Sequence, residues 1–168
     1  MKKRKLVANN IDTEILLPAD IHEILNKYHH LLQNYTNLRE PNSIFTTFKR
    51  TSNKLSVLFP LKEHPIHGIT GLHATEKYDE SGHVIEYHYS WEIISPKQGV
   101  IYSHISAWEN EPHAEPDTLE KFIVHSEPHH HHHHVPGDRR QRKENFDVHT
   151  LDAAFAFVEK YIESGDEY

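Results

Sequence analysis

The sequence predicts an α+β domain in which an antiparallel β-meander sheet is flanked by an N-terminal and a C-terminal helix. Apolar residues recur at helical spacing after residue 20 and again after residue 150. Between these regions, from about residue 44 to residue 108, extended segments alternate with short turns. The chain has 168 residues, which is most economically one domain. We expect this domain to cover residues 19–168, after a flexible arm over residues 1–18.

The first helix is predicted to begin at Asp20, because Glu23 follows three positions later in the pattern of a capping box. We expect it to end near Leu38, before Pro41. Three histidines fall mostly off the apolar stripe of this helix and are expected to face solvent: His22, His29 and His30. The stripe itself consists of Ile21, Ile24, Leu25, Tyr28, Leu31, Leu32 and Tyr35.

Five strands are predicted next, and the short turns between them imply an antiparallel meander. In the clearest strand, alternation places Ile85, Tyr87, Tyr89, Trp91 and Ile93 against the core. Glu86, His88, Ser90 and Glu92 then face the other way. That polar face is either simply solvated or functional, since Glu86 could orient and tune His88. The predicted strands are Ile44–Arg50, Leu55–Leu61, Gly68–Tyr78, His83–Ile94 and Val100–Trp108.

The last third of the chain is less regular and contains six consecutive histidines, His129–His134. A loop over Glu109–Asp117 and a short strand over Phe122–Ser126 precede this run. A basic loop through Arg142 follows it, and Thr150 can cap a final helix. Because a long segment follows the run, we interpret it as native, with an inserted purification tag as the alternative.

Composition excludes several classes of function. The formal charge is -7 with all 18 histidines neutral, which argues against broad electrostatic adhesion to nucleic acid, although basic clusters at residues 2–5 and 139–143 could contact RNA locally. The chain has no cysteine, which excludes disulfides, thiolate nucleophiles and cysteine-ligated zinc. No apolar stretch is long enough to span a bilayer. We therefore expect a soluble cytoplasmic protein.

Several motifs carry a family resemblance: Val84–Trp91 (VIEYHYSW), Val100–Tyr102, Trp108–His113 (WENEPH), Pro128–His130 and the helix that starts at Thr150. With these motifs the stretch from His83 to Ile162 resembles the TumE-like family, small bacterial proteins regarded as toxins of toxin–antitoxin pairs. The resemblance implies a growth-inhibiting protein that is neutralised by a helix-turn-helix antitoxin encoded nearby, with RNA cleavage as the expected activity. The chain departs from the family pattern in its longer histidine run and in Glu109 and Glu111.

RNA cleavage without a metal needs a base for the ribose 2′-hydroxyl and an acid for the leaving oxygen, and two imidazoles can supply both. We expect His88, assisted by Glu86, or His129 to be the base, and His130 or His113 to be the acid. His113, His129 and His130 match the recurring histidines of the family. The expected phosphate contacts are Arg139, Arg140 and Arg142. Trp108 either stacks on a base, worth about 1–3 kcal/mol, or closes the sheet edge over the core.

The competing hypothesis is a non-enzymatic module that binds metal or responds to pH. On an extended segment alternate histidines share a side, so His129, His131 and His133 form one set. The other set is His130, His132 and His134. Either set could chelate Ni²⁺ or Zn²⁺ adventitiously, whereas the RNA-cleaving hypothesis requires no cofactor. A homodimer that pairs sheet edges is a further expectation.

Overall fold

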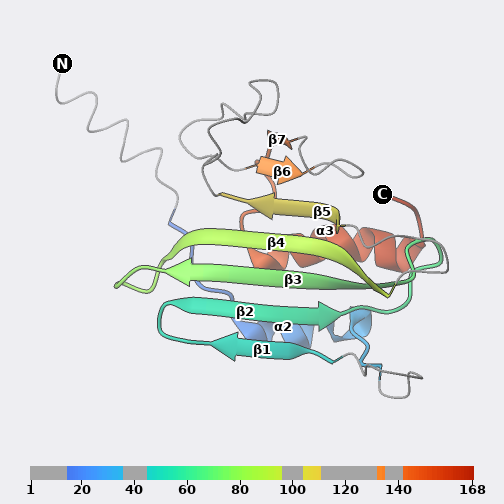
Figure 1. The fold of residues 1–168 in the computed structure, drawn as a ribbon, viewed down its shortest axis with the longest axis horizontal. Coiled ribbons are helices and arrows are strands. Elements are labelled where there is room, and N and C mark those ends of the chain that lie inside the picture. The colour runs from blue at the N-terminus through green and yellow to red at the C-terminus, as the bar shows by residue number, and fades with distance from the viewer. Residues whose placement is uncertain (1–14, 36–44, 96–103, 111–131, 135–141) are drawn as a thin grey trace.

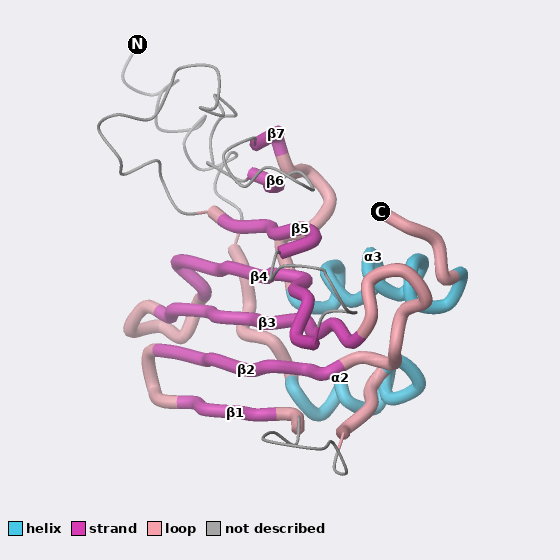
Figure 2. Tube along the Cα trace, turned by 45° about the vertical axis from the view of Figure 1, so that its right-hand side comes forward, coloured by secondary structure: helices cyan, strands magenta, loops and turns pink. Residues whose placement is uncertain are grey.

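The described residues form a seven-stranded antiparallel sheet, and its strands follow one another in chain order from β1 to β7 (Figure 1). The computed structural model describes residues 15–35, 45–95, 104–110, 132–134 and 142–168. Two helices lie against the same face of the sheet, as Figure 2 also shows. They are α2 (Ile21–Tyr28), continued by the 3₁₀ turn η1 (His29–Leu31), and α3 (Leu151–Ser164). The strands are β1 (Thr47–Arg50), β2 (Lys54–Pro60), β3 (Ile69–Tyr78), β4 (Val84–Ser95), β5 (His104–Glu109), β6 (His132–His134) and β7 (Arg142–Glu144).

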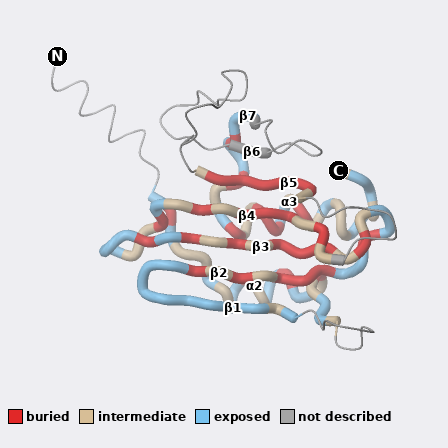
Figure 3. Tube along the Cα trace, in the orientation of Figure 1, coloured by how far each residue is buried: buried red, intermediate tan, exposed pale blue. Residues whose placement is uncertain are grey.

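The core lies between the sheet and the two helices, as the alternation along the central strands predicts. Leu72 on β3 pairs with Phe59 on β2 and with Trp91 on β4, and all three side chains are fully buried. Figure 3 shows β3, β4 and β5 mostly buried, whereas β1 is exposed along its length. The α+β meander with two helices is therefore confirmed, and among the described residues the second face of the sheet carries no helix.

Local signals in the sequence fix both helices. The Asp20 carboxylate accepts a hydrogen bond from Glu23 N at 3.1 Å, and the Thr150 hydroxyl accepts one from Ala153 N at 3.2 Å. The last turn of α3 ends at Gly165, which has φ 75° and donates its N–H to Tyr161 O. Each helix thus has a sequence-encoded start, and α3 also has a glycine stop.

The first helical segment ends at Leu31, so the prediction of an end near Leu38 is wrong. Leu32 instead forms a β-bridge with Leu61, and Gln33 N donates to Pro60 O at 3.1 Å. The Tyr35 hydroxyl donates to Leu61 O at 2.7 Å. The apolar residues after position 31 therefore contact the end of β2, and this tertiary pairing overrides their helical spacing.

Three further differences concern the edges of predicted elements. Ile85 is 54% exposed and Val84 is buried in its place, because the register shifts between Lys77 and Tyr78 on the neighbouring strand. Leu16 is buried, and its carbonyl accepts a hydrogen bond from Val84 N, so residues 15–18 belong to the folded unit. The predicted strand Phe122–Ser126 lies outside the described residues.

Among the described residues, no helix has the length and apolar character needed to cross a membrane.

Strands β6 and β7 were not predicted. β6 is formed by the second half of the histidine run and pairs with β5, while β7 lies at the end of the expected basic loop. The histidine run is therefore connected to the sheet through its last three residues.

Candidate functional site on the open face of the sheet

The open face of the sheet, opposite the helices, brings together an imidazole and a carboxylate. His88 on β4 is the cross-strand partner of Glu109 on β5. His88 Nε2 lies 3.6 Å from Glu109 Oε2, and the two side chains are 29% and 11% exposed. This is an ion-pair distance in a largely enclosed setting, where electrostatic interactions are stronger than in water.

Asn110 holds the end of β5 against β4 and thereby fixes this pair. Its Oδ1 accepts a hydrogen bond from Tyr87 N at 2.8 Å, and its Nδ2 donates to Ile85 O at 3.1 Å. The backbone N–H of Asn110 also bonds Tyr87 O. These three hydrogen bonds tie the end of β5 to β4 and thereby keep Glu109 opposite His88.

Glu109, and not Glu86, is the carboxylate that accompanies His88. Glu86 Oε2 lies 2.7 Å from Lys77 Nζ on β3 and is engaged there. In the sequence, Glu109 stands out only as a departure from the family pattern. Its place beside His88 depends on the pairing of β4 with β5. The sequence feature that could have indicated this contact is the position of Glu109 directly after the predicted fifth strand.

Pairing continues the row of polar positions into the histidine run. Glu109 is the register partner of His132 on β6, and His132 is the register partner of Glu144 on β7. Cross-strand partners share a face of a sheet. The register positions that line up across β4 to β7 are therefore 88, 109, 132 and 144.

The remaining predicted site residues divide into two groups. His133 pairs with Trp108, and Arg142 pairs with His134, so both take part in the sheet. The others lie outside the described residues: His113, His129, His130, His131, Arg139 and Arg140.

Trp108 belongs to the core and is not a stacking platform. It is 1% exposed, and its ring packs edge-to-face on Phe157 of α3 with the ring centroids 4.8 Å apart. A base could not reach this ring without opening the core. Of the two interpretations of Trp108, the structure supports the tryptophan that closes the sheet over the core.

His64 has a structural role. Its ring is fully buried, its Nδ1 accepts hydrogen bonds from the N–H groups of Ile66 and His67 at 3.1 Å, and its Nε2 lies 2.8 Å from Asp166 O. Through the contact with Asp166 O this ring holds the C-terminal segment. Burial, followed by the neighbouring His64, lowers the pKa of His67.

A second buried carboxylate lies on the helix side of the sheet. Glu76 is 1% exposed and accepts hydrogen bonds from Ala19 N at 3.0 Å, the Tyr78 hydroxyl at 2.9 Å and the Tyr89 hydroxyl at 2.5 Å. Burial and the nearby Glu76 raise the pKa values of both tyrosines. A cavity of about 300 Å³ lies beside this group, between residues 17–20 and the starts of α2 and α3. Because three donors from separate parts of the fold hold the Glu76 carboxylate, we interpret the cluster as structural.

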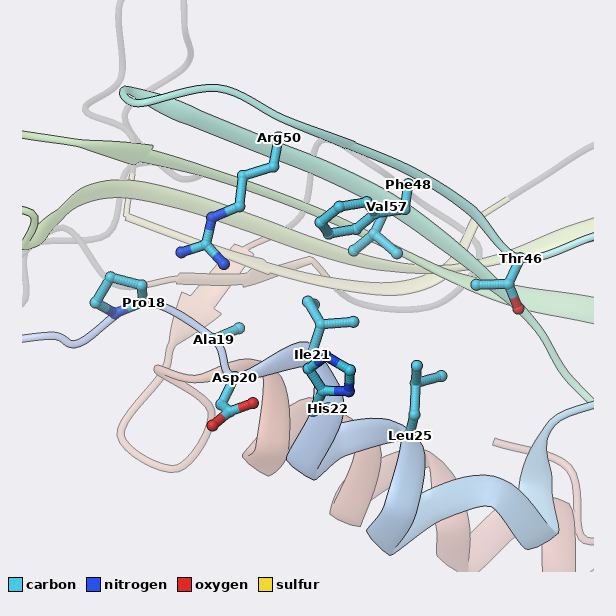
Figure 4. A pocket seen from close by; sticks show the side chains of 10 residues that line it. All are labelled: Pro18, Ala19, Asp20, Ile21, His22, Leu25, Thr46, Phe48, Arg50 and Val57. Atoms are coloured by element: carbon cyan, nitrogen blue, oxygen red, sulfur yellow. The ribbon is translucent and has the colours of Figure 1, made fainter.

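Among the described residues, a larger cavity of about 660 Å³ lies between α2 and the β1 edge (Figure 4). Most of its wall is apolar and is formed by Phe48, Val57, Ile21 and Leu25. Arg50 lies at one end. It is a groove without a paired acid and base, which distinguishes it from the open face.

Within the part of the chain that the structure describes, one group of side chains could hold a metal ion: His30, Glu159 and Glu163, whose ligand atoms all lie within 4.8 Å of one another. It lies between η1 and α3, on the helix side of the sheet. From the sequence we expected His30 to face solvent, and this group was not predicted.

Comparisons of the chain with protein-family models, curated proteins and solved structures gave no match. The function has to be inferred from the chemistry of these side chains.

Proposed function

We propose that this protein is a toxin of the TumE-like kind that cleaves RNA by metal-independent acid–base chemistry on the open face of its sheet. The observation that carries the proposal is the His88–Glu109 pair, with His132 next to Glu109 in the strand register. A histidine whose Nε2 lies near a shielded carboxylate is the arrangement that general base catalysis uses.

In the proposed mechanism, His88 Nδ1 takes the proton from the ribose 2′-hydroxyl as that oxygen attacks the phosphorus, while the proton on Nε2 faces Glu109 Oε2. Glu109 stabilises the imidazolium that forms. A second imidazole from the histidine run donates a proton to the leaving 5′-oxygen. The expected products are a 2′,3′-cyclic phosphate and a free 5′-hydroxyl. Phosphate contacts would come from the basic loop that ends in Arg142.

The test is cleavage of a labelled RNA by the purified full chain in the presence of EDTA. General acid–base catalysis contributes about 10²–10⁴-fold, so His88→Gln should reduce kcat at least about a hundredfold. Glu109→Gln should reduce it as well, while the protein keeps its fold by circular dichroism. Glu86→Gln is the matched control, because this carboxylate is on the same strand but is paired with Lys77. It should keep kcat within about twofold.

The toxin part of the proposal has its own test. Induced expression should arrest growth, His88→Gln should relieve the arrest, and co-expression of a helix-turn-helix protein encoded beside the gene should neutralise it. High expression without loss of viability or of RNA would contradict the proposal. Equal effects of Glu86→Gln and Glu109→Gln would contradict the assignment of the pair.

A second candidate function is metal binding by the histidine run. The observation in its favour is that His132–His134 form an extended strand, in which alternate positions share a face. Calorimetry with Ni²⁺ or Zn²⁺ on chelator-treated protein should then show a number of bound ions that falls when residues 129–134 are replaced by serine and asparagine. An unchanged number of bound ions in that variant would exclude the run as a ligand.

A further inference from the structure

A cluster of one imidazole and two carboxylates lies where the first helical segment meets the last helix. His30 Nε2 is 2.9 Å from Glu159 Oε2 and 3.3 Å from Glu163 Oε1. The two glutamates are four residues apart on α3, so they project from the same side of that helix one turn apart. Their side chains are 33% and 58% exposed, and that of His30 is 40% exposed.

The backbone around His30 is held firmly. Tyr28 stacks on Phe155 with ring centroids 4.8 Å apart, and its hydroxyl donates to Asp152 O at 3.0 Å. Lys27 Nζ lies 2.8 Å from Asp152 Oδ1. On the other side of His30, Leu31 is 1% exposed. Buried residues therefore fix the position from which the imidazole reaches α3, and little reorganisation is needed to use it as a ligand.

We infer that His30, Glu159 and Glu163 form a binding site for a divalent transition-metal ion, with Zn²⁺ as the best fit. Zn²⁺ binds imidazole nitrogen and carboxylate oxygen at about 2.0–2.2 Å in a tetrahedron, which separates neighbouring ligand atoms by about 3.4 Å. The contacts of 2.9 Å and 3.3 Å from His30 are close to that value. Small movements of the two partly exposed carboxylates would bring the three ligand atoms to that spacing, and water would supply the fourth ligand.

The donor set also selects among ions. Ca²⁺ and Mg²⁺ take oxygen ligands almost exclusively, so the imidazole disfavours both. Two carboxylates neutralise the charge of a divalent ion. The ion would bind through the lone pair of His30 Nε2, so the metal-bound imidazole would carry its proton on Nδ1.

An ion at this site would connect two distant parts of the chain, because His30 and Glu159 are 129 positions apart. A ligand that binds the folded state alone raises stability with its concentration. At a hundredfold excess over Kd the expected rise in Tm is about 5–10 °C for a domain of this size. The site is independent of the proposed RNA cleavage, since it lies on the helix side of the sheet.

The test uses the full chain with residues 129–134 replaced by serine and asparagine, because the histidine run would otherwise dominate metal binding. Titration with ZnCl₂ should give one equivalent bound, and thermal melts should show the rise in Tm. Co²⁺ in place of Zn²⁺ should give the visible absorption of a four-coordinate ion. His30→Gln and Glu163→Gln should each weaken Zn²⁺ binding at least tenfold.

His29→Gln is the matched control, because His29 is the exposed neighbour whose Nδ1 contacts Asn26 O and not α3. It should leave Zn²⁺ affinity unchanged. Glu163→Gln changes a mostly exposed side chain and should fold normally, so a loss of binding in this variant would support the site even if His30→Gln folded poorly. Absence of a Zn²⁺-dependent rise in Tm, or equal loss with His29→Gln, would overturn the inference.

Discussion

The Tyr89 hydroxyl should stabilise the fold more than the hydroxyl of its neighbour Tyr87. Tyr89 donates to the buried carboxylate of Glu76 at 2.5 Å. The Tyr87 hydroxyl donates to a neutral carbonyl, Val148 O, at 3.3 Å and accepts from Asn145 Nδ2 at 3.4 Å. The two rings lie on the same strand, are each 1% exposed and stack with centroids 5.0 Å apart. Tyr89→Phe and Tyr87→Phe therefore remove the same atom from nearly the same environment.

The magnitudes follow from the acceptors. A hydrogen bond to a charged group contributes about 1.5–3 kcal/mol, and a neutral one about 0.5–1.5 kcal/mol. Tyr89→Phe leaves Glu76 with two donors, Ala19 N and the Tyr78 hydroxyl. The carboxylate therefore loses one hydrogen bond and keeps two. We expect a loss of about 1.5–3 kcal/mol, which for a domain of this size lowers Tm by about 3–12 °C.

Urea unfolding at pH 7, followed by tryptophan fluorescence and far-UV circular dichroism, measures both losses. The slope of the free energy of unfolding against urea should be unchanged, which shows that the unfolded reference is the same. If Tyr89→Phe costs no more than Tyr87→Phe, then Glu76 does not act as a charged acceptor and the reasoning about the cluster is refuted.

Three further predictions concern pH and backbone conformation. Burial beside Glu76 raises the pKa values of Tyr78 and Tyr89. The stability that the two hydroxyls contribute is therefore present below about pH 10 and is lost as pH rises above it. In urea titrations, Tyr78→Phe should reduce the decrease in the free energy of unfolding at alkaline pH. Burial lowers the pKa of His67, so stability should fall as pH drops below about 6.5, and His67→Phe should reduce that fall in thermal melts. Gly165→Ala should cost more than Gly82→Ala in the same melts, because both have positive φ but only at Gly165 would a Cβ meet a proline ring, at 3.0 Å.

The sequence was sufficient for the elements whose signals are local. Alternation between apolar and polar residues with short turns predicted the meander, and the Thr150 cap with its apolar stripe predicted α3. The prediction failed where a long-range contact determines the local structure. The stripe of the first helix continues past Leu31 in the sequence, yet Leu32 pairs with Leu61, 29 positions away. Periodicity cannot distinguish a residue that faces a helix neighbour from one that meets a strand.

The candidate site shows the same limit. His88 was identified from its place on a polar strand face, but its partner was expected two residues away on the same strand. The structure places Glu109 opposite it because β4 and β5 pair, and it engages Glu86 with Lys77 instead. Likewise, His30 meets Glu159 only because the first and last helices pack together. Pairs that form across 21 or 129 positions require the topology before they can be named.

Whether the histidine run is a strand of this sheet or an appended tag can be decided by cross-linking. The chain has no cysteine, so two introduced thiols can react only with each other within one molecule. Ala107 and His134 are Cα partners across β5 and β6. Partners in an antiparallel pair have Cα atoms about 4.5–5.5 Å apart, within the range that a disulfide spans.

The double variant Ala107→Cys with His134→Cys should therefore oxidise readily to an intramolecular disulfide. The control is Ala107→Cys with His132→Cys, in which the second thiol lies two residues further along the same strand. That shift separates the Cα atoms by about 8 Å, which is too far for a disulfide without backbone movement. Thiol counting and peptide mass mapping after mild oxidation measure both. Equal oxidation of the two variants is the result expected of a freely moving run, and it would remove His132 from its place beside Glu109. Selective oxidation of the in-register variant would leave that place intact, and with it the second imidazole that the proposed chemistry requires.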